Sequence, residues 1–116
     1  MPTSNKKNSS KKELPRLSAI DQDVLTVLRR GHELYGLEIL DSLNVDARPH
    51  ELRFSSLYPA LDRLVDRELL TWRWGDDDDR SGGARRKYYK ITAKGNSALG
   101  AVEAYRDLLR NPAPAT

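Results

Sequence analysis

Apolar residues recur every three or four positions in two early segments and predict two amphipathic helices. The first covers about 19–30, with Ser18 and Asp21 at the spacing of a capping box and Gly31 as its stop signal. The second falls in "YGLEILDSLN", where leucines lie three residues apart, and ends near Asn44. Proline and polar residues in "VDARPHE" predict a loop after it.

The segment "RFSSLYPALDRLVDREL" predicts a third helix over about 55–68. Ser55 or Ser56 is expected at its N-cap, where a hydroxyl accepts a hydrogen bond from a backbone amide. Pro59 would break a helix interior but is tolerated in a first turn, so it is expected to mark where this helix begins. The apolar stripe that should face the core consists of Leu57, Leu61, Leu64 and Val65.

Two segments in the second half, "LLTWRW" and "RKYYKI", alternate in polarity and are rich in aromatic residues. They predict two strands joined as a hairpin by the loop between them. Trp72 and Trp74 share one face of the first strand; we expect them to pack in the core, and the alternative is a shelf for a flat aromatic ligand. Of Tyr88 and Tyr89, one is expected in the core and the other at the surface.

A fourth helix is predicted after Thr92, which is expected to cap it. Four of its residues recur at spacings of four, three and four, which is typical of a coiled-coil seam; they are Ala98, Val102, Tyr105 and Leu109. We expect two copies of the chain to dimerise through this seam. The alternative is that the stripe packs on its own domain.

Composition limits the chain of 116 residues to one domain. Residues 1–16 are mostly Ser, Asn and Lys and predict a disordered basic arm, and the proline-containing residues 111–116 predict a disordered tail. No apolar run reaches the roughly 20 residues of a membrane span, and no apolar stretch follows the lysine-rich start. No membrane association is therefore expected, and a cytoplasmic location is the default. The absence of cysteine excludes disulfides and zinc sites built on thiolates.

Opposite charges are crowded into "RWGDDDDRSGGARRKYYKIT", whereas the net charge of the whole chain is only +3. Four consecutive carboxylates at positions 76–79 cannot converge on one cation, so no metal site is expected and the run is interpreted as a solvated tip that repels phosphates. The returning half is basic, and its glycine pair at 82–83 allows close approach to a nucleic acid. Its cations, expected to bind phosphates, are Arg80, Arg85, Arg86 and Lys87.

Three helices followed by a hairpin is the order of a winged helix-turn-helix domain. In sequence and spacing, "YGLEIL", "SSLYPALDRLVDRELL" and "GARRKYYKITAKG" resemble the PadR family of bacterial transcriptional regulators over roughly residues 20–100. The expected fold is mainly α with a small β-hairpin: a winged helix-turn-helix domain over 17–91 and a dimerisation helix over 92–110. The resemblance implies a homodimeric regulator, usually a repressor, that binds double-stranded DNA. The chain is similar to the short subclass with one trailing helix, which includes a modifier of the circadian clock, so a clock gene is one candidate target.

The resemblance also assigns roles within the third helix, which is expected to enter the major groove while the wing contacts the DNA backbone. In a dimer, the third helices of the two copies are expected to lie about 34 Å apart. The matching tyrosine in the family lies at the DNA face, so Tyr58 is expected at a phosphate, against the alternative of a packed ring. Arg63 suits a guanine edge, and its alternative is an ion pair with Asp62 or Asp66. The expected DNA-binding residues are Ser55, Ser56, Tyr58, Arg63, Arg80, Arg85, Arg86 and Lys87.

Other classes of function have weaker support in the sequence. His32 and His50 are far apart without an acid and nucleophile beside them, and "SGGARRK" lacks the spacing of a phosphate-binding loop, so neither an enzyme nor a cofactor is expected. Two alternatives remain. One is a protein-interaction module on the same scaffold, and the other is a regulator that senses a small aromatic effector with its tryptophans.

Overall fold

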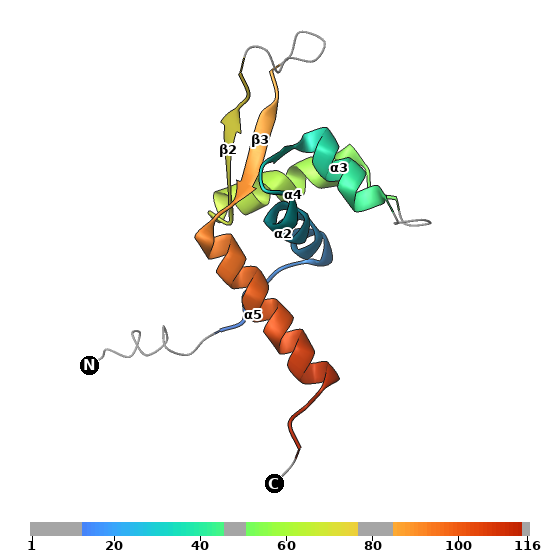
Figure 1. Ribbon diagram of the computed structural model, residues 1–116, viewed down its shortest axis with the longest axis vertical. Helices are drawn as coiled ribbons and strands as arrows, with labels where there is room; N and C mark the ends of the chain where they lie inside the picture. Colours follow the sequence, from blue (N-terminus) through green and yellow to red (C-terminus); the bar gives the residue numbers. More distant parts are fainter. Residues whose placement is uncertain (1–12, 46–50, 77–84, 115–116) are drawn as a thin grey trace, which may run out of the picture.

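The computed structural model describes residues 13–45, 51–76 and 85–114. This part of the chain is mainly helical with one small sheet, which confirms the predicted fold class (Figure 1). In chain order its elements are α2 (Ala19–Gly31), β1 (Leu34–Tyr35), α3 (Gly36–Asn44), α4 (Phe54–Asp66), β2 (Leu70–Trp74), β3 (Lys87–Ile91) and α5 (Ala93–Arg110). Most of the basic arm predicted over 1–16 and the end of the tail predicted over 111–116 lie outside the described residues.

Helix α2 begins with the predicted capping box. The amide of Asp21 donates to Ser18 Oγ and the amide of Ser18 donates to Asp21 Oδ2, both over 3.1 Å. These two bonds satisfy backbone donors that no helical carbonyl can reach. Gly31 is the last helical residue, and the positive φ of 67° falls on His32.

Helix α4 begins at Phe54, one residue before Ser55 and two before Ser56, so the predicted serine cap is wrong. Arg53 is the N-cap, and its carbonyl accepts from the amides of Ser56 and Leu57 over 2.9 and 3.0 Å. Both serines thus lie within the first turn, where their side chains are exposed. Pro59 lies in the second turn rather than the first; the exposed surface there lets water replace the hydrogen bond that proline cannot donate.

The sheet has three strands in the order β1, β3, β2, and not the two predicted from alternation. The additional strand, β1, is the two-residue segment between α2 and α3. It pairs antiparallel with β3, with Leu34 opposite Tyr89 and Tyr35 opposite Tyr88. A two-residue strand is too short to show a period of two, which explains why the sequence pattern missed it.

The core lies where α2, α3, α4 and α5 meet the base of the sheet. Its fully buried side chains include Leu25, Leu28, Ile39, Leu57, Leu61, Leu64 and Leu99. Tyr89 joins them, while Tyr88 is half-buried, as the alternation predicted. The prediction that the tryptophans pack in the core is wrong: Trp72 is 37% and Trp74 48% exposed, because β2 extends beyond the helices that cover its first residue.

Helix α5 is capped as predicted, with the amide of Gly95 donating to Thr92 Oγ1 over 2.9 Å. A side chain at Gly95 would meet the carbonyl oxygen of Leu69 at 2.2 Å, so only glycine permits this close approach to the start of the sheet.

Beyond Gly95, helix α5 leads away from the domain (Figure 1). Arg29 of α2 holds it by donating to both carboxylate oxygens of Glu103, over 2.9 and 2.7 Å, which lowers the pKa of Glu103.

Candidate nucleic-acid interface

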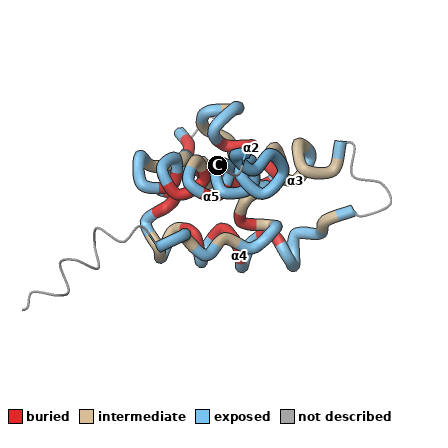
Figure 2. The backbone as a smooth tube through the Cα atoms, turned by 90° about the horizontal axis from the view of Figure 1, so that it is seen from below, coloured by how far each residue is buried: buried red, intermediate tan, exposed pale blue. Residues whose placement is uncertain are grey.

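Helix α4 forms a layer along one side of the molecule, and its outer side is exposed (Figure 2). Its inner side is the predicted leucine stripe, buried against α2 and β2. The exposed side includes Ser55, Ser56, Tyr58, Pro59 and Asp62. An exposed helix face of this kind is what a winged-helix domain places in a DNA groove.

A hollow of about 340 Å³ lies between the first turn of α4, the start of α3 and the wing. The wing is the hairpin of β2 and β3, which rises past α4 (Figure 1). The hollow combines aromatic and cationic side chains, and its lining includes Tyr35, Phe54, Tyr58, Trp74, Arg85, Arg86 and Lys87. The structure thereby brings together four residues that the sequence assigned to DNA from two distant segments.

Tyr58 occupies the wall of this hollow nearest to α3. Its ring stacks on Phe54 with centroids 5.2 Å apart, yet the residue remains 44% exposed. Gly36, the first residue of α3, makes room for it, because a Cβ at position 36 would lie 2.5 Å from the Tyr58 hydroxyl. The ring is therefore positioned by Phe54 and Gly36 while the residue remains partly exposed.

The cations of the wing lie over aromatic rings. The guanidinium of Arg86 lies 4.4 Å from the Tyr35 ring centroid, and Lys87 Nζ lies 4.1 Å from that of Trp72. Such contacts restrict a long side chain but leave its charge intact. Arg85 is fixed in a second way, since its Nη2 donates to the carbonyl of Gly75 over 3.0 Å. The returning strand therefore presents positive charge in a partly ordered form.

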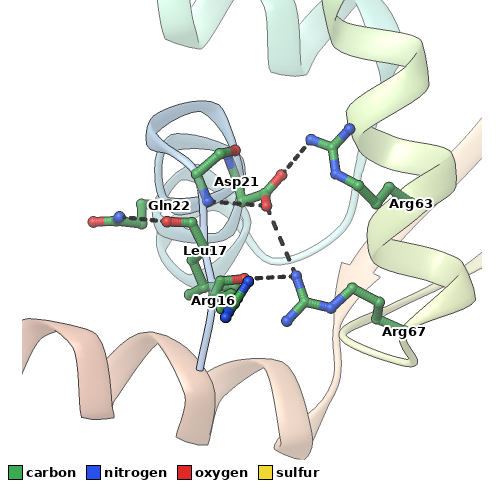
Figure 3. A network of polar contacts seen from close by, with 7 residues as sticks. Arg16, Leu17, Asp21, Gln22, Arg63 and Arg67 are labelled. Atoms are coloured by element: carbon green, nitrogen blue, oxygen red, sulfur yellow. Dashed lines mark hydrogen bonds and ion pairs between the residues drawn. The ribbon is translucent and has the colours of Figure 1, made fainter. Parts of the chain in front are cut away.

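Arg63 lies farther along α4 and bonds to α2. Its Nη2 donates to Asp21 Oδ1 over 2.6 Å (Figure 3), so its ion-pair partner is neither of the two aspartates considered from the sequence. Asp21 is only 2% exposed, whereas the Arg63 side chain is 46% exposed. The ion pair with Asp21 therefore holds the guanidinium toward α2 and uses part of its donor capacity.

Asp21 also connects α4 to the segment before α2. Arg67 Nη1 lies 3.9 Å from Asp21 Oδ2 and donates to the carbonyl of Arg16 over 2.8 Å (Figure 3). One buried carboxylate therefore caps α2, binds Arg63 of α4 and lies within ion-pair distance of Arg67, the C-cap of α4. Sequence reasoning found only the cap, because Asp21 and Arg63 are 42 positions apart.

Burial raises the pKa of Tyr89 to about 12, with smaller contributions from Asp62 and Tyr58. This hydroxyl stays protonated at any physiological pH, and the residue, which lines the hollow, is otherwise buried in the core. It is not a group that could exchange protons with a ligand there.

One expected DNA-binding residue, Arg80, falls outside the part of the chain that the structure describes, as do the aspartates at 77–79 that were interpreted as a solvated tip. Within the described ranges, no three His, Asp or Glu side chains are grouped so as to hold a metal ion. No helix of that same part of the chain is both long and apolar enough to cross a bilayer.

The expected dimer seam on α5 divides into two halves. Ala98 and Val102 are buried within their own domain, which was the alternative interpretation. Tyr105 and Leu109 are exposed, as is Leu108, so the apolar surface that a partner could cover begins at Tyr105, about two turns later than the pattern implied.

The helix order, the winged sheet and the exposed face of α4 define a winged-helix DNA-binding protein. The transcriptional regulator PadR-like family matches residues 24–101, and the chain belongs to this family. The protein is therefore a DNA-binding transcriptional regulator and not an enzyme. No curated protein matches the sequence significantly.

Solved structures of the family share this fold. A PadR-like transcription factor from Bacteroides fragilis is 30% identical with a TM-score of 0.68, over 91% of this chain and 92% of that one. A PadR family regulator from Clostridium difficile R20291 is 25% identical with a TM-score of 0.68, over 80% and 92%. The circadian clock associated protein Pex from Anabaena is 20% identical with a TM-score of 0.58, over 95% and 96%, which shows a common fold alone.

Proposed function

We propose that the protein is a sequence-specific repressor that binds duplex DNA as a homodimer, with α4 in the major groove and the wing on the backbone. The observation that carries this proposal is the continuity between the exposed first turn of α4 and the cationic hollow beside it. A groove-binding helix needs phosphate contacts on its flank to fix its register, and Arg85, Arg86 and Lys87 supply them. Blocking a promoter requires nothing beyond such binding.

Within α4, the first turn is the part we assign to DNA. Ser55 and Ser56 donate from the beginning of the helix, where the dipole also favours an anion, and the Tyr58 hydroxyl reaches a phosphate from the hollow. Arg63 supports the orientation of α4 through Asp21 instead of reading a base. Replacing Arg63 with alanine should then lower stability but leave sequence preference intact.

The homodimer rests on the exposed end of α5. Tyr105, Leu108 and Leu109 are exposed at helical spacings of three and four, so they share one apolar face of the helix end. Pairing through α5 would present two α4 helices to half-sites one turn of DNA apart, about 34 Å. The cations of residues 1–12, which lie outside the described residues, would add contacts to the backbone.

The test is selection of genomic fragments by the purified protein, followed by titration of the selected duplex against salt. We expect a recurrent two-half-site sequence upstream of a regulated gene, with the chain's own promoter and clock genes among the candidate targets. Binding should weaken steeply with salt, since each bound phosphate contributes about 0.9 to the slope of log K against log salt. Recovery of random fragments with equal affinity would refute sequence-specific regulation.

Charge removal at the wing provides a matched comparison. The double variant Arg85→Ala and Arg86→Ala should weaken all duplexes alike and reduce the salt slope by about 0.9 for each phosphate that the variant no longer binds. The double variant Arg30→Ala and Arg110→Ala removes the same charge from exposed positions of α2 and α5. An equal weakening in the two double variants would show that net charge, and not the wing, binds the backbone.

A further inference from the structure

The wing carries two exposed tryptophans that the proposed function has not used. Trp72 and Trp74 meet edge to face, with ring centroids 5.2 Å apart and an interplanar angle of 85°. Exposing two indoles on one small hairpin leaves a large apolar area in contact with water. An exposed aromatic cluster of this kind marks a surface where a partner binds.

The strand register shows which way this pair faces. Trp72 lies opposite Tyr89 and Trp74 lies opposite Lys87, so both indoles are on the face of the sheet that is buried at its base. That face looks toward α4, since Trp74 lines the same hollow as Phe54 and Tyr58. A DNA duplex that binds to the exposed first turn of α4 would therefore also lie close to Trp74.

Two cations flank the indole pair. Lys87 Nζ is 4.1 Å from the Trp72 centroid and 5.8 Å from the Trp74 centroid, while the guanidinium of Arg85 is 5.6 Å from the latter. The surface thus alternates apolar rings with positive charges over a few ångströms. The backbone of DNA has the complementary alternation, because apolar deoxyribose rings are joined by anionic phosphates.

We infer that Trp74, supported by Trp72, packs on a deoxyribose of the duplex backbone beside the groove that α4 enters, with Lys87 and Arg85 on the adjoining phosphates. This inference rests on the proposed function, because it needs the duplex to lie against α4. A sugar is the occupant, since the bases of a duplex are stacked and paired and expose only their edges. The indoles are thus part of the DNA-binding surface and are neither core residues nor a shelf for a small ligand.

The chain contains only two tryptophans, so each can be observed alone. The variant Trp72→Phe leaves Trp74 as the only indole, and Trp74→Phe leaves Trp72 as the matched reporter. Binding of a dye-labelled operator duplex is followed by anisotropy, and access to each indole by acrylamide quenching of its fluorescence. On saturation with duplex, the quenching constant of Trp74 should fall, and should fall more than that of Trp72.

Affinity supplies an independent readout. Trp74→Ala should weaken operator binding by about five-fold, whereas Trp74→Phe, which retains an aromatic face, should weaken it less. Val45→Ala, at the exposed end of α3, shortens another exposed apolar side chain and should change nothing. Thermal unfolding of each variant shows whether a reduced affinity reflects a disrupted fold.

The outcomes separate the two proposals. If the wild type gives no change in anisotropy with any duplex, the proposed function fails. If the wild type binds the operator while Trp74 stays as accessible to acrylamide as before, only the present inference fails. Stronger protection of Trp74 by a single strand of the same sequence would also overturn it, because that result indicates stacking on an unpaired base.

Discussion

The contact between Gly36 and Tyr58 shows how a single missing side chain can set a binding surface. The hydroxyl of Tyr58 occupies the space that any Cβ at position 36 would need. Gly36 is the first residue of α3, and the atom that a Cβ there would meet is the far end of the Tyr58 side chain. The position of the tyrosine on α4 is consequently decided by a residue on another helix.

Replacing Gly36 with alanine should displace the Tyr58 ring and weaken operator binding about tenfold, close to the effect of removing one hydrogen bond to a charged group. The measurement is anisotropy titration of the operator duplex, corrected for the folded fraction. In a Tyr58→Phe background the same substitution should have less effect, because the hydroxyl that the new Cβ displaces is already absent and the ring carbon 3.1 Å away needs only a small shift. Additive effects of the two substitutions would contradict this explanation.

Tyr89 predicts the behaviour of the fold at high pH. Because its pKa is raised to about 12 by burial, the folded state keeps the proton that the unfolded chain releases from about pH 10. The stabilisation that follows from a pKa raised from 10 to about 12 is about 3 kcal/mol; it is complete below pH 10 and is lost as the pH rises through 12. Urea unfolding of the wild type and Tyr89→Phe across this range should show a shallower decline for the variant. If the free energies of unfolding of the two proteins decline in parallel with pH, Tyr89 is not the source of the alkaline loss of stability.

At the scale of elements, Asp21 joins two helices through one carboxylate. Asp21→Ala should lower the free energy of unfolding by about 2 kcal/mol, because it removes half of a capping box and the bond from Arg63. Urea denaturation measures this change, and Asp23→Ala is the control, since Asp23 is an exposed carboxylate of the same helix. In the double variant Asp21→Ala with Arg63→Ala, the loss in free energy of unfolding should be smaller than the sum of the losses in the two single variants. Full additivity would show that the ion pair contributes nothing to stability.

The sequence predicted the elements whose signals are local. Ser18 and Thr92 cap their helices as expected, because a cap depends on a few neighbouring residues. The start of α4 was misplaced, since two serines in a first turn resemble a cap equally well. The exposure of Trp72 and Trp74 was missed because alternation tells which residues share a face but not whether a helix covers that face. Long-range pairs, such as Asp21 with Arg63, leave no spacing to detect.

At the scale of the whole molecule, α5 contributes both to the domain and to the proposed dimer. Its first half is buried on α2 and the sheet, and its last turns project beyond them (Figure 1). The domain should therefore tolerate changes in the last turns without unfolding, because those turns add nothing to the core. Dimerisation and folding become separable properties of one helix.

Leu109→Lys should convert a dimer into a folded monomer, because it places a charge in the exposed apolar surface. Sedimentation velocity would show the change in mass, and operator affinity should fall by at least about tenfold, as two half-sites are no longer bound together. Asn111→Lys adds the same charge just beyond the helix and should leave the mass unchanged. A Leu109→Lys protein that stays dimeric would place the interface elsewhere.

The short strand β1 determines which residues must be transferred when the wing is exchanged between related proteins. Leu34 and Tyr35 are hydrogen-bonded to β3, and Glu33 beside them accepts two bonds from Arg73 of β2, each 2.9 Å long. A wing exchanged between relatives by cutting only at residues 69 and 92 would leave these partners behind. A chimera that also transfers residues 33–35 retains the whole sheet, so the transplantable unit of this protein is discontinuous in sequence and includes the segment that leads into α3.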